Sequence, residues 1–198
     1  LGTEEDFRTL CREAGCRGIR VMLDGVFNHT GSNSRYFNAQ GFYPELGAAQ
    51  SRESQYYNWY SFHPWPEDYD AWWGIKTLPA VQESADSYRR FIIRDGDSVV
   101  RHWLRQGASG WRLDVADELP DDFIAEIRSA MDQEKPDSFL LGEVWEDGSN
   151  KIAYSQRRRY LLGSETHGLM NYPFRTAALD WLRGGDAAVF RDTMEVIR

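Results

Sequence analysis

GWRLDVADE, residues 110–118, gives the clearest indication of the fold, because a short apolar strand runs directly into charged side chains. We predict a strand over 110–115. Arg112 and Asp114 lie two residues apart, so on a strand their side chains point to the same face. A guanidinium beside Asp114 favours the ionised form of that carboxyl. An ionised aspartate at a strand end is a candidate nucleophile.

Two further predicted strands also end in acidic side chains. Asp24 follows the apolar residues 19–23, and Glu143 lies near the end of residues 139–144. In a parallel array all the carboxyl ends of the strands lie on one face, which in a βα barrel is the active-site face. We therefore expect Asp24, Asp114 and Glu143 to converge.

Helical patterns separate these strands, which predicts an α/β fold with a parallel sheet built from βαβ units. Thr3 and Asp6 form a capping-box signature that starts the first helix, and apolar residues then recur at helical spacing. The other predicted elements are helices over 87–93, 97–106, 120–131, 152–162 and 173–183, a short strand over 168–172, and a last helix from Asp186.

Glu143 has the features of a protonated carboxyl. We expect it on the strand next to Asp114, close to that anion and partly buried, and both effects raise the pKa of a carboxyl. One ionised and one protonated carboxyl facing each other is the arrangement that a retaining glycosidase needs.

Residues 30–85 differ in character from the rest of the chain. They are rich in Gly, Ser, Asn and Pro, show no sustained period, and hold nine aromatic residues between Tyr56 and Trp73. A structureless loop of this length is unusual in a compact domain, so we predict a small inserted subdomain between segments 1–29 and 86–198. The aromatic rings are suited to stack on apolar pyranose faces or to form the core of the subdomain, and both alternatives stay open.

The amino-acid composition limits the kinds of partner that the chain is suited to bind. The 198 residues include 31 acidic and 23 basic ones, a formal net charge of -8. This balance argues against a nucleic-acid partner and against a basic membrane-surface protein, and no apolar run is long enough to span a bilayer. Cys11 and Cys16 have neither disulfide-framework nor metal-ligand spacing, which indicates thiols in a reducing compartment. We expect a cytoplasmic protein.

Three motifs carry a resemblance to a known family. DGVFNH (24–29), GWRLDVADE (110–118) and GEVW (142–145) resemble, in order and spacing, the first three signature regions of the α-amylase superfamily, glycoside hydrolase family 13. WWGIKTLPAV (72–81) and GLMNYPF (168–174) are similar to the neopullulanase, cyclomaltodextrinase and maltogenic amylase branch. The resemblance covers essentially the whole chain. It implies a partial TIM (β/α)8 barrel, about strands three to six, with the irregular subdomain inserted after strand three.

The resemblance also implies roles for particular residues. Asp114 would be the nucleophile, and Glu143 the general acid and then the base. Arg112 would orient Asp114, His29 would bond a sugar hydroxyl, and Asp24 would hold the hydrogen-bond network under that sugar. Further substrate contacts would come from Glu118 on the acceptor side and from Trp72, Trp73 and Trp145.

No cofactor is required by this chemistry. Asn28 lies where many α-amylases have a calcium ligand, but the favoured branch often leaves that site unused, so calcium stays open. The family's third catalytic aspartate has no counterpart after Glu143 in this chain.

The function implied is that of a catalytic-domain fragment of a retaining α-glucan hydrolase. Its substrates would be α-1,4-linked: maltooligosaccharides, cyclodextrins, starch or pullulan. LPAVQE (78–83) stands where the branch usually has MPKLN, and Trp145 is followed by Glu-Asp rather than His-Asp. A debranching or dual α-1,4/α-1,6 glucanase, resembling amylopullulanases, is therefore one alternative. A non-catalytic barrel homologue or a carbohydrate-binding protein is an alternative of another class.

The isolated chain is expected to be inactive, because the third aspartate and other barrel strands are absent. It is also expected to self-associate through the open strand edges at 19–23 and 168–172.

Overall fold

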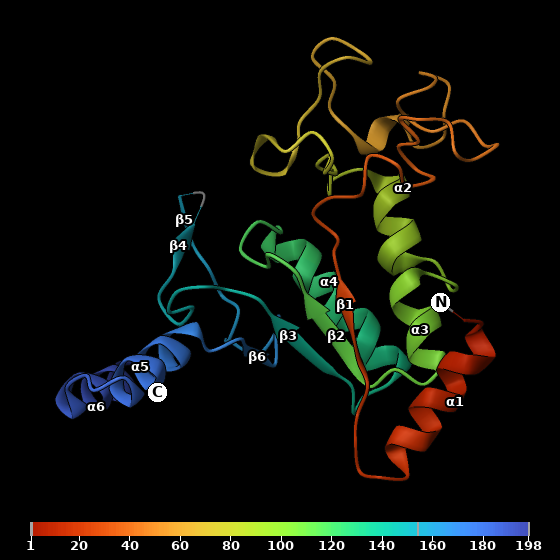
Figure 1. Ribbon diagram of the computed structural model, residues 1–198. Helices are drawn as coiled ribbons and strands as arrows, with labels where there is room; N and C mark the ends of the chain where they lie inside the picture. The colour runs from red at the N-terminus through yellow and green to blue at the C-terminus, as the bar shows by residue number, and fades with distance from the viewer. Residues whose placement is uncertain (1, 154, 198) are drawn as a thin grey trace.

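A four-stranded parallel sheet, in the order β1-β2-β3-β6, is the centre of the computed structural model, which describes residues 2–153 and 155–197 (Figure 1). The strands are β1 (Met22–Gly25), β2 (Gly110–Leu113), β3 (Phe139–Gly142) and β6 (Gly168–Leu169). Asp24 pairs with Arg112 across β1 and β2, and Leu113 pairs with Gly142 across β2 and β3. This register brings the ends of the three predicted strands level with one another.

Helices cover one side of this sheet. They are α1 (Glu4–Gly15), α3 (Val99–Arg105) and α4 (Asp121–Glu134). The predicted capping box starts α1: the Thr3 backbone N–H donates to Asp6 Oδ2 over 2.7 Å, and the Asp6 N–H donates back to Thr3 Oγ1 over 3.2 Å. The last two helices, α5 (Tyr172–Leu182) and α6 (Ala187–Val196), pack against each other at the lower left of Figure 1, away from the other helices.

The core lies between the sheet and α3 and α4. Leu113 of β2 and Leu140 of β3 are fully buried against the apolar face of α4. That face carries Phe123, Ile127 and Met131, spaced four residues apart as a buried helix requires. Burial of this apolar surface holds the strand ends, and therefore the acidic residues, in place.

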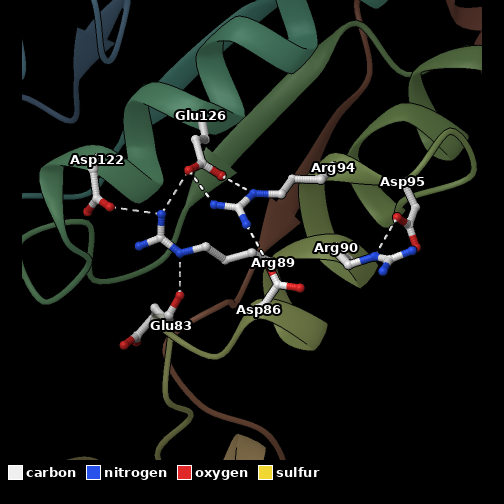
Figure 2. A network of polar contacts seen from close by, with 8 residues as sticks. All are labelled: Glu83, Asp86, Arg89, Arg90, Arg94, Asp95, Asp122 and Glu126. Atoms are coloured by element: carbon white, nitrogen blue, oxygen red, sulfur yellow. Dashed lines mark hydrogen bonds and ion pairs between the residues drawn. The ribbon is translucent and has the colours of Figure 1, made fainter.

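The chain re-enters the sheet domain through α2 (Asp86–Arg89) and a π-helical turn, η3 (Arg90–Arg94). Arg89 is buried and ties this segment to α4 (Figure 2). Its Nη1 lies 2.8 Å from Asp122 Oδ2 and 2.9 Å from Glu126 Oε1, and its Nε donates to the Glu83 carbonyl oxygen over 2.6 Å. The guanidinium thus links the end of the inserted segment to the N-terminal half of α4.

Arg94 adds a second cation to this network. Its Nη2 donates to Glu126 Oε1 and its Nη1 to Asp86 Oδ1, both over 2.7 Å. Hydrogen bonds from Arg94 and Arg89 outweigh burial and hold the pKa of Glu126 below its usual range. Figure 2 shows the two guanidiniums converging on Glu126, while Arg90 pairs separately with Asp95.

Residues 30–85, all of which the structure describes, contain two short 3-10 turns, η1 (Tyr57–Trp59) and η2 (Trp72–Gly74), and loops. Most of the aromatic run forms a small core here. Fully buried Phe37 packs on Tyr60 and Tyr69 with ring centroids 4.9 and 4.7 Å apart. The core alternative therefore holds for the buried part of the run, and the sugar-stacking alternative is left for its exposed end.

The helix predicted over 152–162 is wrong. The structure has a hairpin there, β4 (Ile152–Ala153) and β5 (Gln156–Arg157), with residue 154 outside the described residues. Arg158 is 5% exposed, and its guanidinium donates to the carbonyl oxygens of Asp117 and Leu119 over 2.8 and 2.6 Å. Hydrogen bonds to these carbonyls require the Arg158 side chain to turn inward, away from the solvent.

The first strand differs from expectation in place and in burial. The apolar character of residues 19–23 predicts a buried strand, but β1 begins at Met22, and Ile19 is 59% exposed. β1 and β6 are the two edges of the described sheet, so each has a neighbour on one side only. The last predicted strand is also shorter, because the Asn171 side chain accepts from Phe174 N over 2.9 Å and caps α5.

Glu165 is a buried acidic group outside the cluster of strand-end acids. It is fully buried, and neither carboxyl oxygen has a hydrogen-bond partner in the part of the chain that the structure describes. Burial, and then the charge of Asp121, raises its pKa from the ordinary 4.5 to about 7. A carboxyl that is buried and neutral in the folded chain loses its proton at a lower pH when the chain is unfolded. Its contribution to stability is therefore lost as the pH rises from 4.5 towards 7.

Glu165→Gln should remove this dependence. Relative to the Gln variant, the free energy of unfolding of the wild type should fall by about 3 kcal/mol between pH 4.5 and 8. Urea unfolding at several pH values measures the difference, with exposed Glu53→Gln as the control. A wild-type-to-variant difference that does not change with pH would contradict the assignment.

None of the helices in the described part of the chain is long and apolar enough to cross a membrane.

Candidate active site

The guanidinium of Arg112 is the centre of the candidate site. Its Nη1 lies 2.7 Å from Asp24 Oδ1 and 2.6 Å from Asp114 Oδ1, and its Nη2 lies 2.8 Å from Glu143 Oε2. The three acids come from the ends of β1, β2 and β3, so the expected convergence is present. One cation offsets their mutual repulsion, and the side chains of Asp114 and Glu143 are mostly shielded from solvent.

Glu143 is held by donors on both carboxyl oxygens. Oε2 accepts from the Val115 backbone N–H over 3.0 Å, in addition to its contact with Arg112. Oε1 accepts from Trp145 Nε1 over 3.0 Å and from the Tyr172 hydroxyl over 3.2 Å. Each of these contacts of the carboxyl is therefore with a hydrogen-bond donor.

This arrangement overturns the expected protonation of Glu143. Burial acts to raise the pKa of Glu143, but the hydrogen bonds from Val115 and Trp145 and the charge of Arg112 together outweigh it, so the pKa lies below its usual range. The expectation was wrong because it counted burial and a neighbouring anion but not the donors, which come from segments that the strand pattern does not align.

Val115 supplies its N–H through an unusual backbone conformation. Its φ is 40°, in the left-handed region that a β-branched residue rarely adopts. The flanking N–H groups are used as well: Asp114 N donates to the Gly25 carbonyl over 3.1 Å, and Ala116 N donates to the Glu143 carbonyl over 3.0 Å. The strained turn thus connects Asp114 to Glu143 directly, and such strain is typical of functional sites.

His29 lies beside these acids and is buried. Burial lowers the pKa of its imidazole, against the opposing charges of Asp114 and Glu118. Its Nδ1 is 3.3 Å from Asn28 Oδ1. Because an amide oxygen can only accept, Nδ1 carries the proton, and in the neutral ring Nε2 is an acceptor for a ligand hydroxyl.

A row of aromatic rings extends from His29. Trp72 stacks on His29 and Trp73 stacks on Trp72, with ring centroids 5.2 and 5.0 Å apart. Trp73 meets Trp145 edge-on at 5.8 Å, and its Nε1 donates to Glu118 Oε1 over 3.0 Å. Trp73 is 66% exposed, and its φ of 50° lies in the left-handed region. The structure therefore brings all the predicted aromatic contacts and Glu118 into one surface next to the acids.

Asn28 does not gain a metal-binding cluster from the fold. Within the described residues, no group of three or more His, Cys, Asp or Glu side chains could hold a metal ion. Asn28 Oδ1 is instead engaged with His29. Calcium also accepts amide and backbone carbonyl oxygens, so its use at Asn28 stays a prediction.

Two contributors to the site were not identified from the sequence. Tyr172 lies within the GLMNYPF stretch, but the sequence predicts no role for it. The one feature that could have drawn attention to Tyr172 is its place next to a helix cap. The Val115 N–H has no side-chain signature at all, because it depends on a backbone conformation.

Comparison with known proteins gives a consistent result. The catalytic domain of alpha amylase is the family that matches, over residues 1–195. An amylopullulanase of Thermoanaerobacterium saccharolyticum is 37% identical over 93% of this chain and 15% of its own length. A cyclomaltodextrinase of Geobacillus thermopakistaniensis is 32% identical over 98% of this chain and 31% of its own length.

A solved structure is similar in fold as well. The cyclic alpha-maltosyl-(1→6)-maltose hydrolase from Arthrobacter globiformis, in complex with cyclic alpha-maltosyl-(1→6)-maltose, superposes with a TM-score of 0.80 and 29% identity. The match covers 100% of this chain and 42% of that one. The chain thus spans less than half of each of these relatives.

Proposed function

The chain belongs to the alpha-amylase catalytic-domain family, glycoside hydrolase family 13, and on that premise we propose that it provides the nucleophile and the acid/base of a retaining α-glucan hydrolase. The observation that carries the proposal is the pair of carboxyls, Asp114 and Glu143, held on the single guanidinium of Arg112. Two carboxyls at short range on one face are what the retaining reaction uses.

The first chemical step is a displacement at the anomeric carbon. Asp114 attacks that carbon, its carboxylate oxygen forms the new bond, and the bond to the leaving glycosidic oxygen breaks. Glu143 gives its proton to that oxygen, so the product leaves as an alcohol and Glu143 becomes a carboxylate. Arg112 orients Asp114 for the attack.

The second step reverses these roles. Glu143, now ionised, removes a proton from water, and the water oxygen attacks the anomeric carbon and displaces Asp114. The donors around Glu143 favour its carboxylate, the form that this step needs. Substrate that displaces water from Glu143 raises its pKa by desolvation, and we propose that protonation for the first step accompanies binding.

The surface around the acids supports an α-glucan as the substrate. Trp73 and Trp145 offer apolar ring surface for pyranose faces, and His29 Nε2 is an acceptor for a hydroxyl. Glu118, tied to Trp73, is proposed to lie on the acceptor side. We propose α-1,4-linked glucans as the main substrates, namely maltooligosaccharides, cyclodextrins, starch or pullulan.

A dual α-1,4/α-1,6 activity is the second candidate. The 37% identity with a protein named amylopullulanase, against 32% with a cyclomaltodextrinase, favours it. Cleavage of both linkages would need an acceptor surface that tolerates two directions of chain.

The chain spans 15% of the amylopullulanase and 31% of the cyclomaltodextrinase, so we propose that it forms strands three to six of a larger eight-stranded barrel, whose remaining strands supply the third aspartate. The isolated chain is then expected to be inactive and to associate through β1 and β6. From the two thiols we propose a cytoplasmic location.

The test uses a complete catalytic domain that contains these 198 residues. Maltotetraose, β-cyclodextrin and pullulan are the substrates, and proton NMR follows the anomeric configuration of the first product. We expect the α-anomer first, with fragments released by cleavage of α-1,4 bonds. From pullulan, panose indicates cleavage of α-1,4 bonds and maltotriose indicates cleavage of α-1,6 bonds. Initial formation of the β-anomer would contradict the retaining mechanism, and no product from any glucan would contradict the hydrolase proposal.

A further inference from the structure

Tyr172 differs from every other group that contacts Glu143 in the described part of the chain. The other partners are N–H groups: the Val115 backbone and Arg112 on Oε2, and Trp145 on Oε1. An N–H of this kind can donate a hydrogen bond but cannot accept one. The Tyr172 hydroxyl, 3.2 Å from Oε1, is able to do both.

This difference decides where a proton can be carried on Glu143. A proton on Oε2 would point at two donors, so that oxygen is disfavoured. A proton on Oε1 can be donated to the Tyr172 oxygen, provided that the phenol rotates its own hydrogen away. Among the partners that the structure describes, Tyr172 is the one that can accept it.

We propose that Tyr172 is a positioning residue for acid/base catalysis: its hydroxyl places the proton of Glu143 on Oε1 in the acid form and donates to Oε1 in the carboxylate form. The proposal rests on the proposed hydrolase function and goes beyond it by assigning the oxygen that transfers the proton. Substrate would then receive the proton from Oε1, displacing the hydrogen bond to Tyr172.

The fold holds Tyr172 in place for this role. It is the first residue of α5, directly after Asn171, whose side chain caps that helix. Burial, and then the hydrogen bond and charge of Glu143, raise the pKa of the phenol above its ordinary value of 10.0. The hydroxyl therefore keeps its hydrogen throughout the neutral range and is available as a donor.

The charged groups that face this pair come from all the neighbouring elements. Arg112 of β2 contacts Glu143 and lowers the pKa of both Glu143 and Tyr172. Asp114 and Asp24 also contact Arg112, and their negative charges offset part of its positive charge. Arg175 of α5 also lowers the pKa of Tyr172. Each of these groups is retained in Tyr172→Phe, so that variant isolates the hydroxyl.

Removal of the hydroxyl has a predictable direction. The hydrogen bond to the ionised carboxylate is charge-assisted and is stronger than the one accepted from the neutral acid. Tyr172→Phe should therefore raise the pKa of Glu143 and move the basic limb of the kcat/KM profile, which reports the free enzyme, upward by roughly one pH unit. In the acid form the proton is no longer directed to Oε1, so turnover falls as well.

The experiment compares wild type, Tyr172→Phe and exposed Tyr43→Phe in a complete catalytic domain containing this chain. Each is assayed from about pH 2.5 to 9 on maltotetraose and on 2,4-dinitrophenyl α-maltoside, whose leaving group needs little protonation. We expect Tyr172→Phe to shift the basic limb upward and to lose about tenfold in kcat on maltotetraose, with a much smaller loss on the aryl glycoside. Tyr43→Phe should match wild type.

A second substitution at the same position should shift the basic limb in the opposite direction. With 3-fluorotyrosine at position 172 the ring is kept and the hydroxyl becomes a stronger donor, so the basic limb should move downward. If Tyr172→Phe does not fold, the 3-fluorotyrosine variant still tests whether the Tyr172 hydroxyl sets the pKa of Glu143.

Two results overturn the assignment, and they are distinct from failure of the function. An active wild type whose basic limb is unmoved by the position-172 substitutions removes the proposed role of Tyr172. Equal proportional losses on both substrates point to a purely structural role and also overturn it. A wild type that cleaves neither substrate instead contradicts the hydrolase function on which the proposal rests.

Discussion

Asp114→Asn in a complete catalytic domain is expected to lower kcat on maltotetraose by about 10⁴-fold or more while changing glucan affinity little. The amide has the shape of the carboxylate and its oxygen can still accept from Arg112, but it lacks the negative charge needed to form the glycosyl-enzyme bond. Loss of a nucleophile is felt in the transition state rather than in ground-state binding.

Single-turnover kinetics and calorimetric binding of maltotetraose measure the two halves of this prediction. Asp137→Asn, at an exposed position away from the site, is the matched control and should behave as wild type. If Asp114→Asn kept a tenth of wild-type turnover on every α-glucan tried, Asp114 would not be the nucleophile.

Glu143→Gln is expected to have an effect of similar size that depends on the leaving group. General acid catalysis contributes about 10²- to 10⁴-fold, and all of it should be lost on maltotetraose. Formation of the glycosyl-enzyme from 2,4-dinitrophenyl α-maltoside needs almost no proton transfer, so that step should be spared. The intermediate should then accumulate, because its hydrolysis needs Glu143 as the base.

Pre-steady-state release of dinitrophenol reveals this as a burst followed by slow turnover, and mass spectrometry identifies the glycosylated chain. The variant should also lose the part of the pH profile that Glu143 governs. Exposed Glu53→Gln controls for the substitution itself. A loss that is the same for both leaving groups would remove Glu143 from the acid role.

The acidic strand ends show how far local pattern reaches. Arg112 and Asp114 share a face because residues i and i+2 do so on any strand, and Asp24 joins them because parallel strands end on one face. These relations are local or follow from the fold class. The convergence of Asp24, Asp114 and Glu143 on one face of the sheet therefore follows from the strand pattern, whereas their common contact with Arg112 does not.

The protonation of Glu143 shows where local pattern stops. The pKa of a carboxyl depends on which donors lie within about 3 Å, and here they come from the Val115 turn, from Trp145 and from Tyr172. Tyr172 lies 29 residues further along the chain, and no periodicity relates the two. The prediction from burial and a neighbouring anion had the wrong sign for this reason.

The helix predicted for the segment after β3 was wrong for a related reason. Residues 152–162 have only a weak helical pattern, whereas in the structure Arg158 donates hydrogen bonds to carbonyls of the loop after β2. A long-range demand for hydrogen bonds overrode weak local preference.

The parallel α/β fold, the three acids and the aromatic segment near them can be predicted from the amino-acid sequence, because they follow from strand and helix periods and from residue chemistry. Which groups touch one another depends on the packing of the whole fold. This applies to the guanidinium common to three acids, the Val115 N–H and the Tyr172 hydroxyl on Glu143, and the row of rings from His29 to Trp145. Hydrogen bonds act over about 3 Å, a distance that is set by how separate elements pack rather than by spacing along the chain.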